Sequence, residues 1–132
     1  MAQVTIENGR LTLHLEGIAR FVHLNDEISV PVGHVVSVEA RPEPPMNMMG
    51  HLGAMLGAGT HVPGLIKVGT FVGRDGRVFY ALRHRSRAIV IELKDERFRR
   101  LIFDAPEQTD PQAYAEGIRS HLRDHGRTPP LV

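Results

Sequence analysis

Short β-rich runs separated by turn residues fill most of the chain, and they restrict its fold more than any other feature. In residues 10–16, leucines at every second position alternate with polar side chains, which is the period of a strand that buries one face. Asn8-Gly9 precedes this run, and the dipeptide tolerates the positive φ angles of a tight hairpin turn. Residues 4–7 and 10–16 are therefore predicted to form paired strands.

The following β-rich run, EISVPVGHVVSVEA, carries the same alternation twice. It passes through Ile28 and Val30, is interrupted at Pro31, and resumes through Val36 and Val38. Proline cannot donate a hydrogen bond to a central ladder and is confined to edges or bends. The run is therefore predicted to form two strands with a kink between them, with Val36 and Val38 facing the same way.

Two short polar connections organise the second half of the chain. Asp75-Gly76 and the stretch RHRSR separate the apolar runs KVGTFV, RVFYAL and AIVIEL. Short connections of this kind predict three consecutive antiparallel strands. The run RFRRLIFDA after residues 94–96 adds another strand.

The hydrophobic period changes near residue 110. In TDPQAYAEGIRSHLRDHG, Tyr114, Ile118 and Leu122 recur every four residues, which predicts one amphipathic helix ending near Gly126. Thr109 or Asp110 can cap it, since Pro111 suits the first helical position. Residues 127–132 contain nothing that favours packing, and a loose tail is expected there.

Several motifs resemble those of bacterial pleckstrin-homology-like (PH-like) domain proteins of uncharacterised function. The resemblance covers roughly residues 10–125 and rests on EISVPVGHVVSVEA, GTHVPGLIKVGTF, DGRVFYALRHRSRAIVIEL and DPQAYAEGI. It implies a mainly β fold, a small antiparallel barrel of about seven strands capped by one C-terminal helix. The family supplies no settled catalytic residues, and fold alone does not license a function.

Length and charge set broad limits on the class of protein. The 132 residues fit one domain, predicted over residues 1–126, and the absence of cysteine excludes disulfides and thiolate chemistry. The N-terminus lacks the apolar core of a signal peptide, so we expect a cytoplasmic protein. Residues 1–66 carry three basic and six acidic groups, and residues 67–132 carry thirteen and nine, which permits a weakly basic face.

The stretch from Pro44 to Ile66 is uncharged and rich in Met, Gly, Leu and Pro. Its prolines and glycines break it too often for a spanning helix. An apolar stripe at helical spacing runs through it, consisting of Met48, Met49, Leu52, Met55 and Leu56. Either the stripe packs on the chain's own barrel, or residues 46–66 form a segment that meets a partner subunit or a membrane surface.

Metal and anion sites are the remaining alternatives. The thioethers near His51 would suit Cu(I), but their spacing is not diagnostic, and the eight histidines are scattered, so we expect neither metal nor cofactor. An anion or lipid headgroup could be bound by the arginines around the second and third predicted strands, at positions Arg74, Arg77, Arg83, Arg85 and Arg87. No aromatic residues interleave with them, which argues against nucleic-acid binding.

No catalytic motif is present, since the chain lacks a nucleophile elbow, a phosphate loop and a supported acidic pair. The sequence therefore favours a non-enzymatic PH-like binding or scaffolding domain that acts through protein contacts. We expect self-association or another protein partner, with residues 46–66 as the interaction segment. The alternative is a small-ligand or anionic membrane-surface binder that uses this segment and the hairpin region from Arg74 to Arg87.

Overall fold

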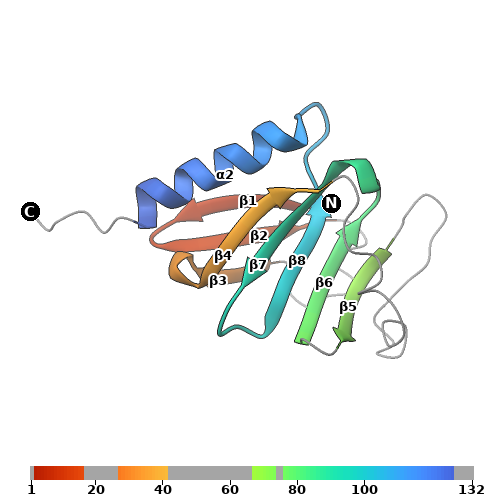
Figure 1. The fold of residues 1–132 in the computed structure, drawn as a ribbon, viewed down its shortest axis with the longest axis horizontal. Coiled ribbons are helices and arrows are strands. Elements are labelled where there is room, and N and C mark those ends of the chain that lie inside the picture. Colours follow the sequence, from red (N-terminus) through yellow and green to blue (C-terminus); the bar gives the residue numbers. More distant parts are fainter. Residues whose placement is uncertain (1, 17–26, 42–66, 74–75, 127–132) are drawn as a thin grey trace, which may run out of the picture.

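The computed structural model of the chain describes residues 2–16, 27–41, 67–73 and 76–126. Eight strands in two sheets and one long helix make up this part of the chain (Figure 1). The first sheet has the order β1-β2-β3, and its strands are β1 (Ala2–Glu7), β2 (Arg10–Leu15) and β3 (Glu27–Pro31). The second has the order β4-β7-β8-β6-β5, and its strands are β4 (Val35–Ala40), β5 (Lys67–Gly73), β6 (Gly76–Leu82), β7 (Ala88–Leu93) and β8 (Phe98–Asp104).

The predicted first hairpin is confirmed. β1 and β2 pair antiparallel, with Glu7 opposite Arg10 and Ala2 opposite Leu15. Asn8 and Gly9 have φ angles of 53° and 75°, so the turn uses the left-handed region that this dipeptide tolerates. The three leucines of β2 are buried, and they fix which face of the sheet meets the core.

The predicted kink after β3 is also confirmed, and it has a larger effect than expected. A short 3-10 turn, η1 (Val32–His34), follows Pro31 and carries the chain from the first sheet into the second. The Lys94 N–H donates to the His34 carbonyl at 2.9 Å, and the His34 ring lies 2.5 Å from a Glu96 carboxylate oxygen. These contacts fasten η1 to the connection between β7 and β8.

The prediction of three consecutive antiparallel strands is wrong for the third strand. β5 and β6 pair antiparallel as predicted, but β8 lies between β6 and β7, parallel to β6 and antiparallel to β7. The connection from β6 to β7, which includes the 3-10 turn η4 (Arg85–Arg87), therefore passes across the end of β8. There the Asp104 carboxylate accepts the backbone N–H groups of Arg83 and His84, at 2.8 and 3.2 Å.

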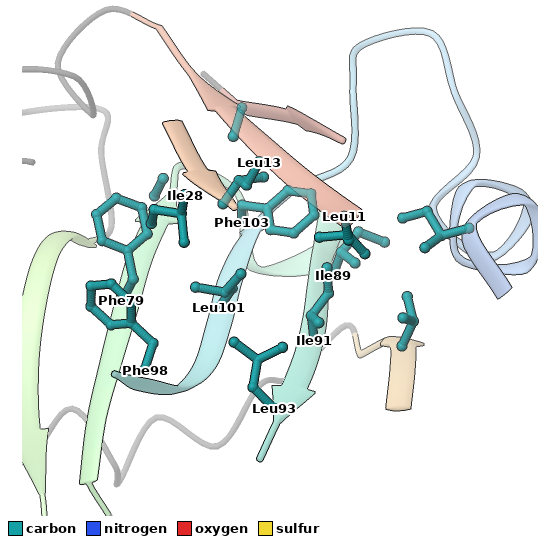
Figure 2. Close-up of a cluster of buried hydrophobic side chains, with 14 of the residues drawn as sticks. Leu11, Leu13, Ile28, Phe79, Ile89, Ile91, Leu93, Phe98, Leu101 and Phe103 are labelled. Carbon is teal, nitrogen blue, oxygen red and sulfur yellow. The ribbon is translucent and has the colours of Figure 1, made fainter. Parts of the chain in front are cut away.

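The main core lies between the two sheets. Leu11, Leu13 and Ile28 of the first sheet face the large apolar side chains of β6, β7 and β8 in Figure 2. The side chains from the second sheet are Phe79, Ile89, Ile91, Leu93, Phe98, Leu101 and Phe103, and none is more than 5% exposed. In the described part of the chain the strands form two separate sheets, so the predicted closed barrel is corrected to an open pair of sheets.

Helix α2 (Pro111–Gly126) lies beside both sheets and has the predicted bounds. Its apolar face, which carries Tyr114, Ile118 and Leu122, packs on the main core. The Tyr114 hydroxyl accepts the Val4 N–H of edge strand β1 at 3.0 Å. The helix thus covers the side of the core where β1 and β4 are the outermost strands of their sheets.

Asp110 is the residue that caps α2, because its carboxylate accepts the Ala113 N–H at 3.0 Å. Replacing it by alanine leaves an N-terminal N–H of the helix without this partner and is expected to lower the free energy of unfolding by about 1 kcal/mol. Urea denaturation of Asp110→Ala measures the change. Asp110→Ser keeps a capping oxygen and should recover most of the loss, whereas equal losses for both variants would contradict a capping role.

Candidate functional site

A groove of about 460 Å³ runs between β4 and the second half of α2. Its floor and walls are formed by η1, β4 and α2 side chains, namely Val32, Val35, Val36, Ser37, Val38, Glu39, Arg119, Leu122 and Arg123. Val36 is 59% exposed, and among the described residues no other large apolar side chain is exposed. Most of the lining is apolar, so the groove offers apolar surface to a partner rather than a polar site for a small molecule.

β4 contributes its outer edge to this groove, and α2 lies beside that edge. It pairs with β7 on one side and stands at the end of the five-stranded sheet. On the other side, the Arg119 guanidinium donates to the Val38 carbonyl. Backbone groups on an edge strand can pair with another strand, and a long side chain of the neighbouring helix occupies one of them here.

The register irregularity between Val35 and Ser37 explains why Val36 is exposed. An extra residue in one strand reverses which face the following side chains occupy. Val38 therefore faces the core at 2% exposure, whereas Val36 faces the groove. The sequence alternation predicted the same orientation for both residues, and this prediction is wrong for Val36.

The charges on the rim come mainly from α2. The Glu116 carboxylate accepts hydrogen bonds from Arg119 at 2.8 Å and from Arg123 at 3.3 Å. These bonds, and first of all that from Arg119, hold the pKa of Glu116 below its usual value. Both arginines are thus positioned along one side of the groove, while Glu39 lies on β4.

Two of the predicted anion-binding arginines share a different cleft. Arg83 and Arg87 line a hollow of about 390 Å³ with the first residues of β1 and the start of the connection after β8. Arg77 lies at the opposite end of β6, about 20 Å away by strand rise. Arg74 and the side chain of Arg85 lie outside the described residues. Among the described arginines, Arg77 therefore does not share the cleft that Arg83 and Arg87 line.

The charges within that cleft are mixed. Glu16, Asp104 and Glu107 line it together with Arg83 and Arg87. The Arg87 guanidinium already donates to the carbonyls of Pro106 and Thr109, at 2.5 and 2.6 Å. Three carboxylates beside two guanidinium groups give a field that does not favour an anion. Anion binding stays a prediction to which this arrangement adds no support.

The predicted interaction segment, residues 46–66 with Met48, Met49, Leu52, Met55 and Leu56, lies outside the described residues. Among the described residues, no group of three or more histidine or carboxylate side chains is arranged to hold a metal ion. His14 instead contacts Thr5 at 2.8 Å, and His121 contacts the Gly117 carbonyl at 3.0 Å.

Sequence reasoning missed the groove between β4 and α2. Its signal was weak: Val35 and Val36 are consecutive valines, which marks a break in the alternation of β4 but does not say which side chain turns outward. Arg119 and Arg123 are one turn apart on the predicted helix, yet only the fold places them beside β4.

Comparison of the chain with protein-family models, curated proteins and solved structures gives no match. The PH-like resemblance therefore rests on the sequence motifs of the chain alone. No helix among the described residues combines the length and the apolar character needed to cross a bilayer.

Proposed function

We propose that the protein is a non-enzymatic PH-like binding domain that acts through protein contacts, and that it self-associates through β4. The observation that carries the proposal is the exposed Val36 on the edge strand β4, beside an apolar groove. The PH-like identity is part of the proposal, and it rests on the motif resemblance, the β-rich architecture and the final amphipathic helix. No catalytic role is assigned to any residue.

An edge strand is best completed by another extended chain, because such a chain pairs with a row of backbone N–H and C=O groups at once. The edge strand of a second copy meets this requirement and brings its own Val36. Two copies related by a two-fold axis use the same surface, which is the commonest arrangement of homo-oligomers. The pairing replaces the Arg119 bond to Val38 by a backbone bond from the partner.

Charge complementarity also favours a second copy as the partner. The groove has Glu39 toward one end of β4, while Arg123 lines it together with Val32 and Val35 at the other. Antiparallel pairing of two β4 strands places the Glu39 end of one copy beside the Val35 end of the other. Each carboxylate then approaches the partner's guanidinium groups, and the pairing register is favoured.

Val36→Arg is expected to weaken self-association at least tenfold, because it puts a cation in the centre of an apolar contact. Native mass spectrometry and sedimentation over a range of concentrations measure the dissociation constant. Gln112→Arg is the matched control, since it adds the same side chain at an exposed position on the first turn of α2, outside the groove. A monomer at all concentrations, or a dimer that Val36→Arg leaves unchanged, would refute the proposal.

A further inference from the structure

The first sheet has a polar face on the side away from the main core. The leucines of β2 pack in the core, so the residues that alternate with them point the other way. Side chains with hydroxyl, imidazole or charged groups gather on this polar face, namely Thr5, Arg10, Thr12, His14, Glu27 and Ser29. They belong neither to the groove beside β4 nor to the main core.

Strand register places a hydroxyl, an imidazole and a carboxylate in one row across the polar face. Glu27 of β3 lies directly opposite His14 of β2. On the other side of His14, Gln3 is the direct partner on β1, and Thr5 is the diagonal neighbour, which lies within reach of a ring side chain. Thr5 Oγ1 is 2.8 Å from His14 Nε2, and Glu27 Oε2 is 3.7 Å from His14 Nδ1. The imidazole thus lies between the hydroxyl and the carboxylate.

The carboxylate of Glu27 favours one tautomer of His14. A negative charge beside Nδ1 favours a proton on that nitrogen and leaves the lone pair of Nε2 free. The Thr5 hydroxyl then donates to Nε2, because an unprotonated ring nitrogen is an acceptor. When the ring takes the hydroxyl proton, the same carboxylate stabilises the imidazolium that forms. The three side chains therefore have the arrangement of a nucleophile, a base and an orienting group.

The other two hydroxyls of the polar face have different partners. Thr12 Oγ1 donates to Ser29 Oγ at 3.1 Å, and Ser29 Oγ also accepts the Arg10 Nε–H at 2.8 Å. A guanidinium stays protonated and cannot take a proton from a hydroxyl. Of the three hydroxyls on this face, Thr5 is therefore the one that is hydrogen-bonded to a base.

The Thr5 hydroxyl is also accessible to a reagent from solution. Thr5 is exposed, and the side chains of His14 and Glu27 are 43% and 56% exposed. A positioned base speeds the removal of a proton from a reacting group by about 10²–10⁴-fold in enzymes. An open sheet face has no walls that activate or orient a substrate, so the reagent has to be reactive by itself. Esters with a good leaving group and thioesters meet this requirement.

We propose that Thr5 is an acylation site, at which the hydroxyl takes an acyl group from an activated ester or a thioester. The bond from Thr5 Oγ1 to the acyl carbon forms, and the bond from that carbon to the leaving oxygen or sulfur breaks. The hydroxyl proton passes to His14 Nε2 and then to the leaving group, while Glu27 is a positioning residue. The products are a Thr5 ester and a free alcohol or thiol. The reaction modifies the chain without turnover and is independent of self-association through β4.

The test incubates the full chain with para-nitrophenyl acetate and locates the acetyl groups by peptide mass spectrometry. Thr5 is expected to be acetylated at least about tenfold faster than Thr12 and Ser29 of the same molecule. His14→Gln should remove this preference, and Glu27→Gln should reduce the rate at Thr5 about threefold, since exposed ion pairs are weak. Thr12→Val is the control variant, because it removes the hydroxyl directly opposite Thr5 and should leave the rate at Thr5 unchanged.

The pH dependence of the rate distinguishes a proton acceptor from a side chain that is only a neighbour. Acidification should slow the acetylation of Thr5 in the unmodified chain, because a protonated imidazole cannot accept the hydroxyl proton. His14→Gln should show a weaker dependence. The charged groups that share the polar face with His14 are Glu7 and Arg10 at the hairpin end and Glu27 beside the ring.

Two outcomes would overturn the proposal. One is equal acetylation of Thr5, Thr12 and Ser29, or a rate at Thr5 that His14→Gln leaves unchanged. The other is the absence of acetyl groups from Thr5, including the case in which the His14 ring carries them instead, because the ring would then be the nucleophile. Circular dichroism of each variant checks that the sheet is retained.

Discussion

Replacing Phe79 by alanine is expected to lower the free energy of unfolding by about 3–5 kcal/mol. The Phe79 ring is fully buried between the two sheets and meets Phe98 edge to face, with ring centroids 5.9 Å apart. The substitution removes the transfer free energy of the ring and leaves a cavity that the paired strands around it cannot close. Urea denaturation, with a check that the slope is unchanged, gives the value.

Tyr80→Phe is the matched comparison, because Tyr80 follows Phe79 on β6 and faces the opposite side of the sheet. It keeps the ring and removes a buried hydroxyl that has no hydrogen-bond partner among the described residues, so stability should stay the same or rise by about 1 kcal/mol. A loss for Phe79→Ala below about 1 kcal/mol would contradict the assignment of this ring to the core.

Local chemistry explains why part of the fold could be predicted from the sequence. The Asn8-Gly9 turn, the alternating leucines of β2 and the four-residue period of α2 each act over a few residues. Each was found where predicted, because a turn, a strand face and a helix face are set by neighbours along the chain. The same holds for the kink at Pro31.

The arrangement of the second sheet depends on contacts between distant residues. The run AIVIEL could pair with any neighbour, and short connections favoured β6. The observed partner is β8, and Asp104 at its end binds the backbone of the connection from β6 to β7. No spacing in the sequence predicts that the Asp104 carboxylate accepts backbone N–H groups from 20 and 21 residues earlier in the chain.

The groove between β4 and α2 could not be predicted from the sequence, because it too depends on how distant residues pair. A single extra residue near Val36 decides whether that side chain enters the core or faces the groove, and alternation alone cannot locate such a residue. The sequence shows that the connection from β6 to β7 is rich in arginine, but it does not show which of these arginines bind the protein's own backbone. Arg83 is exposed in its cleft, whereas Arg87 is half-buried and binds two backbone carbonyls.

Arg87 is therefore expected to stabilise the fold. Arg87→Met should lower the free energy of unfolding by about 2–3 kcal/mol. Its guanidinium joins the start of β7 to the connection between β8 and α2 through the carbonyls of Pro106 and Thr109. Methionine retains the apolar stem and isolates the loss of these charged hydrogen bonds. Thermal and urea unfolding measure the effect.

Arg83→Met is the matched control, because Arg83 lines the same cleft with an exposed side chain. It should change stability by less than about 0.5 kcal/mol, as surface substitutions usually do. Equal, small effects of both variants on stability, together with loss of binding to anionic vesicles in both, would instead assign Arg87 to a ligand. A large effect of Arg87→Met alone would assign the arginine a role in stability, because its guanidinium donates to two carbonyls of the connection that leads into α2.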